Sequence, residues 1–159
     1  MTRVVVLGDS RVGKTEFMHR ATGGQVPLNI YTSVRPERFQ LVGMCTTAEF
    51  TVVPGRADRA MLMAACDGAD AIVVIYNGSI HNATRWLMRC TGRKQTSVPI
   101  LICQHNSAQP PDRRVPDALR DWPTAEHTCT SALYTTGLQD CANRIVRRAR
   151  SEHGSPLGS

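Results

Sequence analysis

The chain has 159 residues, of which 42% are hydrophobic, and it carries a formal net charge of +6. These values suit one globular domain with a sizeable core, and they exclude wholesale disorder. No apolar run approaches the length of a membrane span, and the run at 4–7 lacks the layout of a signal peptide. We therefore expect a cytoplasmic protein with a single domain at 1–150 and a flexible tail or expression remnant at 151–159.

The predicted elements alternate between strands and helices. Several strands are almost continuously apolar, which predicts a mostly parallel sheet covered by helices on both faces. The last helix carries a periodic apolar stripe. In chain order, strands are expected at about 2–7, 39–44, 48–53, 69–76, 98–103 and 127–130, and helices at about 16–21, 57–66, 80–90, 116–122 and 134–150.

Cysteines and basic residues give weaker signals. The six cysteines lie far apart with no C-x-x-C pair, so we expect reduced thiols rather than a disulfide framework or a zinc site.

Four arginines cluster at 144–150. They suit either an anionic surface or the solvated C-terminal end of a helix, where cations are favoured. No aromatic residues are interleaved with them, and we expect no nucleic-acid binding.

The strongest motif lies between the first strand and the first helix. Residues Gly8-Asp9-Ser10-Arg11-Val12-Gly13-Lys14-Thr15 match G-x-x-x-x-G-K-[ST], a phosphate-binding loop. Its backbone N–H groups and the helix N-terminus attract phosphate, Lys14 can reach the β- and γ-phosphates, and the Thr15 hydroxyl can bind Mg²⁺. A strand-to-helix turn without a ligand is the alternative, but such a turn does not require Lys and Thr after the second glycine.

With these elements in order, the chain resembles the Ras superfamily of small GTPases, and the Rab branch most, over about residues 2–150. The resemblance implies a three-layer P-loop fold with a six-stranded, mostly parallel sheet, one antiparallel strand and about five helices. It also implies that Ser131 and Ala132 offer backbone N–H groups to a guanine oxygen. The segments that carry the resemblance are 5–15, 69–77, Trp86, 98–102 and 130–132.

The two switch segments of that family are altered here. Ser33 aligns with a threonine that binds Mg²⁺, so Thr15 and Ser33 are the candidate Mg²⁺ ligands. Val52 stands where the family has a metal-binding aspartate, and it offers no oxygen. Arg56 stands where the family has a water-orienting glutamine, and arginine has no acceptor. Gly55 is retained and could turn its N–H toward a phosphate, while Arg56 could neutralise phosphate charge.

The base-recognition segment is altered as well. Gln104, His105 and Ser107 align with the Asn, Lys and Asp of the family's N-K-x-D motif. Ser107 has no charge and can accept from only one guanine donor, which removes a charge-assisted pairing. His105 could stack on a base, and Gln104 could imitate asparagine. No cysteine lies near the C-terminus, so we expect no direct lipid anchor.

These losses, beside an intact phosphate loop, predict a Rab-like pseudo-GTPase that binds GTP or GDP weakly and hydrolyses little. It would act in signalling or trafficking as a decoy or protein-binding module, with partners on a switch-like face at 31–40 and 55–62. Two alternatives stay open. One is a working but atypical GTPase in which Ser33 and Arg56 compensate, and the other is a small P-loop phosphotransferase.

Overall fold

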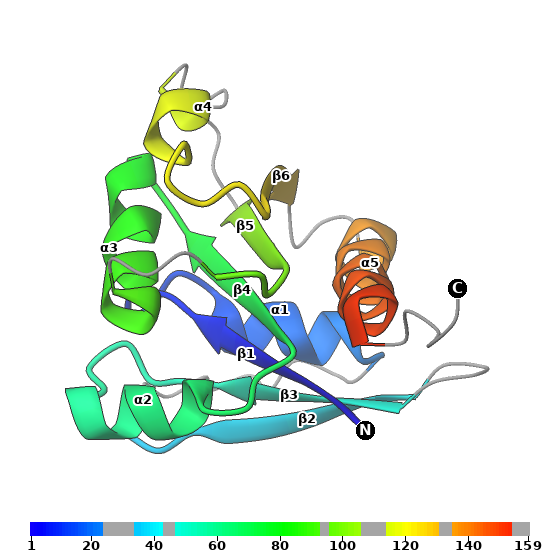
Figure 1. Ribbon diagram of the computed structural model, residues 1–159. Helices are drawn as coiled ribbons and strands as arrows, with labels where there is room; N and C mark the ends of the chain where they lie inside the picture. Colours follow the sequence, from blue (N-terminus) through cyan, green and yellow to red (C-terminus); the bar gives the residue numbers. More distant parts are fainter. Residues whose placement is uncertain (24–33, 43–46, 93–95, 106–113, 131–134, 154–159) are drawn as a thin grey trace.

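The sheet confirms the predicted α/β class. The computed structural model describes residues 1–23, 34–42, 47–92, 96–105, 114–130 and 135–153. Six strands form one sheet in the order β2-β3-β1-β4-β5-β6. Neighbouring strands are parallel except for the antiparallel pair of β2 and β3. Five helices accompany the sheet in the described part of the chain (Figure 1).

The elements follow the predicted chain order. The pairing of β2 with β3 supplies the one antiparallel strand that was expected in the sheet. The strands are β1 Thr2–Leu7, β2 Glu37–Val42, β3 Thr47–Val52, β4 Ala71–Tyr76, β5 Ile100–His105 and β6 Ala125–Thr130. The helices are α1 Lys14–Ala21, α2 Arg59–Cys66, α3 Ile80–Thr91, α4 Val115–Ala118 and α5 Thr135–His153.

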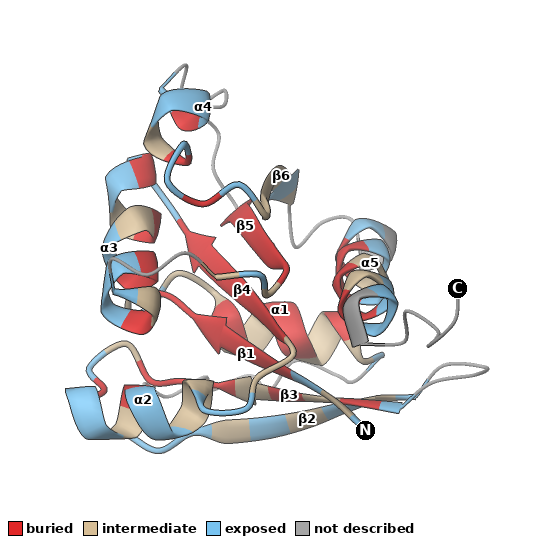
Figure 2. Cartoon of the chain, viewed as in Figure 1, coloured by how far each residue is buried: buried red, intermediate tan, exposed pale blue. Residues whose placement is uncertain are grey.

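Two apolar clusters cover the two faces of the sheet, because side chains alternate along each buried strand. In β1, Val4 and Val6 pack with residues of α1 and α5, whereas Val5 and Leu7 pack with residues of α2, α3 and α4. Strands β4 and β5 are buried along their whole length (Figure 2). The apolar runs therefore form the centre of a three-layer domain.

Several predicted element boundaries were wrong by a few residues. Strand β5 runs to His105, because it has hydrogen-bonded neighbours on both sides up to its last residues. Helix α4 is a single turn, and the chain turns again where the Trp122 N–H donates to the Leu119 carbonyl at 3.0 Å. Helix α5 continues to His153, beyond the helix end predicted at 150. Among the described residues, no helix combines the length and apolarity that crossing a bilayer requires.

Candidate phosphate-binding site

The predicted phosphate loop lies at the edge where parallel strands end. It follows β1 directly and leads into α1, and ligands in open α/β sheets bind at this edge. Two glycines permit its path. A Cβ on Gly8 would collide with the carbonyl oxygen of Ile75, and Gly13 has a φ of 95°, in the left-handed region. Arg11 also has a positive φ, of 65°, which is uncommon for a residue with a side chain.

The Lys14 ammonium folds back over this loop. It donates to the carbonyl oxygens of Gly8 and Asp9, both at 2.7 Å, and the residue is only 8% exposed. Burial lowers the Lys14 pKa from 10.5 to about 8, and the nearby Asp9 carboxylate opposes that shift. The site therefore holds a cation that has little water around it and no carboxylate in direct contact, which favours an incoming anion.

The first turn of α1 offers further donors. Gly13 is its N-cap residue and supplies no side chain to accept from the first N–H groups. Those N–H groups carry the positive end of the helix dipole. Together with Lys14, they form an arrangement suited to phosphate.

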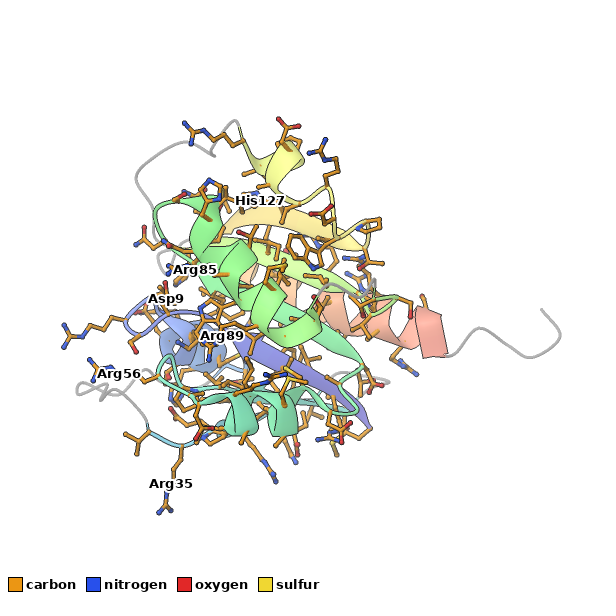
Figure 3. All side chains as sticks on the ribbon, turned by 60° about the vertical axis from the view of Figure 1, so that its left-hand side comes forward. Asp9, Arg35, Arg56, Arg85, Arg89 and His127 are labelled. Atoms are coloured by element: carbon orange, nitrogen blue, oxygen red, sulfur yellow. The ribbon has the colours of Figure 1, made fainter. Side chains whose placement is uncertain are left out.

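The segment after β3 packs directly on the phosphate loop. A Cβ on Gly55 would collide with the backbone N and the Oγ of Ser10. The Ser10 Oγ is itself buried, and no described residue forms a hydrogen bond with it. Gly55 thus lies beside the phosphate loop, near enough for the prediction that its N–H turns toward a phosphate. Arg56 is exposed and extends outward from the domain (Figure 3).

Glu37 contacts the predicted metal ligand Thr15, a contact that sequence reasoning missed. The Thr15 Oγ1 donates to the Glu37 Oε1 at 3.3 Å. Glu37 lies directly across from Val52 in the β2–β3 pair. The one signal that could have found this contact was the hairpin register, which sequence alone does not fix.

The residues present do not fit the metal arrangement that the resemblance implies. Val52 is 4% exposed within the apolar core, and Thr15 already has a carboxylate partner. Ser33 lies outside the described residues. Where side chains are described, no group of three or more His, Cys, Asp or Glu could hold a metal ion. We therefore derive no step through Mg²⁺.

Asp9 connects the loop to α3. Its Oδ1 accepts from the Trp86 Nε1 at 2.9 Å, and its Oδ2 lies 4.0 Å from the Arg85 guanidinium (Figure 3). Arg89 stacks over the Trp86 ring at 4.5 Å and donates to the Ala57 carbonyl oxygen at 2.8 Å. The tryptophan that carries part of the family resemblance thus fixes the phosphate loop against α3.

Two of the predicted base-binding residues, Gln104 and His105, lie at the end of β5. The His105 ring is fully buried and packs edge-on against Phe17, with ring centroids 5.8 Å apart. The Nδ1 lies 2.8 Å from the Thr130 hydroxyl, and a Cβ on Gly13 would meet the ring at 2.9 Å. His105 therefore supports the phosphate loop from beneath, and a ring buried in this way is not free to stack on a base in this conformation.

Gln104 is also buried, at 3% exposure, and its Oε1 accepts from the Cys129 thiol at 3.7 Å. It lies beside His105 in the sheet rather than in a loop, because β5 begins and ends two residues later than the predicted strand at 98–103. Ser107, Ser131 and Ala132 lie outside the described residues. The structure thus brings the loop, Gly55, Thr15 and His105 together.

No protein-family model matches the chain, and no curated protein matches it either.

Proposed function

We propose that this chain is a Rab-like pseudo-GTPase of the cytoplasm, a P-loop protein that binds phosphate groups weakly and acts chiefly by binding other proteins. The observation that carries the proposal is the contrast within one site. Lys14 and the first turn of α1 are arranged for an anion. The positions expected to hold the metal and the base instead carry buried Val52 and buried His105.

That contrast predicts weak and unselective nucleotide binding. Phosphates would contact Lys14 and the N–H groups of the loop, and these contacts are the same for every nucleoside triphosphate. A base would find neither the His105 ring nor a carboxylate at Ser107. Losing a charge-assisted pairing of this kind costs about 1.5–3 kcal/mol, or more than tenfold in affinity.

Slow hydrolysis follows from the residues around Gly55. A γ-phosphate transfer needs a group that orients water and charges that stabilise the transition state. Val52 supplies no metal ligand, and Arg56 extends outward and has no acceptor. We therefore expect little turnover beyond that of an unassisted small GTPase.

The protein-binding surface is proposed to be the described part of the predicted switch-like face. Arg38, Arg56 and Arg59 are exposed on it, and Met61 is half-buried. Leu62, by contrast, is 1% exposed in the core, so it cannot anchor a partner. A surface rich in arginine suits a partner with acidic groups, and arginine is a frequent interface anchor.

The nucleotide content of the purified protein tests this proposal. The protein is denatured, and ion exchange of the supernatant measures any nucleotide that was bound. Refolded or freshly prepared protein is then titrated with GTP and with ATP, each with Mg²⁺ or with a chelator, to measure the affinities. We expect a largely empty protein, similar weak affinities for GTP and ATP, and little effect of Mg²⁺. Lys14→Met should weaken both affinities, while Lys94→Met, the matched control, should change neither.

Two results would overturn the proposal in favour of a working GTPase. One is stoichiometric GDP in the purified protein. The other is clear γ-phosphate release in a single-turnover assay that Lys14→Met abolishes and Lys94→Met does not.

A further inference from the structure

Two thiols meet between helices α2 and α3, on the face of the sheet that also carries α4. Cys66 is the last residue of α2, and Cys90 lies near the end of α3. Their sulfur atoms are 3.5 Å apart, and both belong to or pack against the same apolar cluster. The positions are 24 residues apart in sequence, so the fold rather than local sequence pairs them.

A cavity of about 570 Å³ opens beside this pair. It gives a small reagent room next to Cys90, and Cys66 is itself half-exposed. Two arginines in the lining, Arg59 and Arg89, make the cavity favourable for an anionic reagent. The lining residues are Arg59, Leu62, Met63, Met88, Arg89, Cys90, Thr91 and Gly92.

The two thiols are inequivalent, which gives them different chemical roles. The hydrogen bond between the two sulfur atoms lowers the pKa of Cys66. The same interaction raises the pKa of Cys90, and burial raises it further. Cys66 is also the more exposed of the two thiols, whereas Cys90 is buried. The thiolate is the attacking form, so Cys66 is the nucleophile and Cys90 is the second thiol.

We propose that Cys66 and Cys90 form a dithiol modification site that closes to an intramolecular disulfide by exchange with an anionic small-molecule disulfide such as oxidised glutathione. The Cys66 thiolate attacks one glutathione sulfur, which forms a mixed disulfide and releases one glutathione thiolate. Cys90 then loses its proton and attacks the Cys66 sulfur, which releases the second. The protein loses two electrons and two protons, and one oxidised glutathione becomes two reduced molecules.

Formation of the mixed disulfide on Cys66 favours the following attack by Cys90. Once Cys66 carries a mixed disulfide, it no longer bears the negative charge that holds the Cys90 proton in place. Cys90 is then already within 3.5 Å of the sulfur that it must attack. Closing the bond to its usual length of about 2.05 Å requires only a small movement of the two side chains.

The other described cysteines lack such a partner. Cys103 lies 2.8 Å from the Thr130 hydroxyl and is fully buried, and Cys141 belongs to the cluster on the opposite face of the sheet. Cys129 is exposed and contacts the Gln104 side chain. Cys129 is therefore the control, as an exposed thiol whose hydrogen-bond partner is the Gln104 amide rather than another cysteine.

Intact-protein mass spectrometry in a glutathione redox buffer tests the proposal. The wild-type protein should lose two hydrogens and keep no glutathione on Cys66, and proteolysis should yield a peptide that links 66 to 90. Cys90→Ser should stop at the mixed disulfide on Cys66. Cys66→Ser should leave Cys90 unmodified, and Cys129→Ser should form the 66–90 link as the wild type does.

A second test uses only the unmutated protein, so its result does not depend on whether a variant folds. A trivalent arsenical such as phenylarsine oxide bridges two neighbouring thiols, so it should bind the reduced wild type in a one-to-one complex and protect both cysteines from alkylation. The proposal is overturned if the wild type retains glutathione on Cys66, or if the arsenical protects neither cysteine. It is also overturned if the 66–90 link forms no more readily than a link that includes Cys129.

Discussion

The buried ammonium of Lys14 should make the stability of this protein depend on pH in an alkaline window. Burial lowers its pKa from 10.5 to about 8, so the folded state releases this proton more readily than the unfolded chain. Below pH 8 both states are protonated, and the folded state bears the full cost of burying the charge. Between pH 8 and 10.5 the unfolded chain binds more protons, so the free energy of unfolding rises with pH.

The magnitude follows from the size of the shift. At 1.36 kcal/mol per pKa unit, the buried charge costs the folded state about 3 kcal/mol below pH 8, and about 2 kcal/mol of that is recovered by pH 9.5. Denaturant unfolding of the wild type and of Lys14→Met at pH 7 to 9.5 measures the difference, since the other titrating groups are common to both. Lys94→Met is the control, because the chain has only these two lysines.

Because the chain has only two lysines, the pKa of Lys14 can be measured directly. Selective ¹³Cε-lysine labelling should give two NMR signals, which Lys14→Met assigns, and the Lys14 signal should titrate near pH 8. If Lys14 titrates above pH 10, or if Lys14→Met shows the same rise in stability as the wild type, the ammonium is not buried as described and the reasoning fails.

Anion binding should restore the ordinary lysine pKa. A phosphate beside Lys14 favours its charged form, so binding should take up a proton at pH 8–9.5 and the affinity should fall as pH rises. Calorimetry with tripolyphosphate, in buffers of different ionisation enthalpy, measures that uptake. Binding that is independent of pH, or unchanged in Lys14→Met, would place the anion elsewhere.

Further predictions concern packing and the proposed partner surface. Gly55→Ala should destabilise the fold by about 1–3 kcal/mol, because the added Cβ collides with Ser10. The control is Gly137→Ala on α5, where a Cβ meets no neighbouring atom, and this change should be neutral or stabilising in the same thermal melt. Charge reversal at the exposed Arg38 and Arg59 should abolish capture of an acidic partner and leave the melt unchanged. If the reversals keep full capture, the switch-like face is not the binding surface.

The sequence predicted the sheet well because its signals are local. Apolar runs such as 71–76 are buried on both faces, and the loop between β1 and α1 lies at the sheet edge where its motif requires it. The end of β5 was harder to predict. Gln104 and His105 are polar, so we expected them to lie beyond the strand. Pairing of Gln104 with both β4 and β6, and of His105 with β6, keeps them in the sheet.

Contacts between distant elements could not be predicted in the same way. The Thr15–Glu37 contact depends on the register of β2 against β3, and the Cys66–Cys90 contact depends on how α2 and α3 pack. Neither spacing has a sequence signature, because each pair lies more than twenty residues apart. Such contacts follow only from the assembled fold.

The buried position of Lys14 argues against the simplest alternative, a strand-to-helix turn without a ligand. A turn needs glycine at positions of positive φ, but it gains nothing from an ammonium that costs about 3 kcal/mol to bury. Two carbonyl oxygens hold that ammonium, and they offset only part of the cost. An anion would offset much more, since it pairs directly with the charge. These energetics support the proposal that the loop binds phosphate, beside a position where buried Val52 offers a metal no ligand.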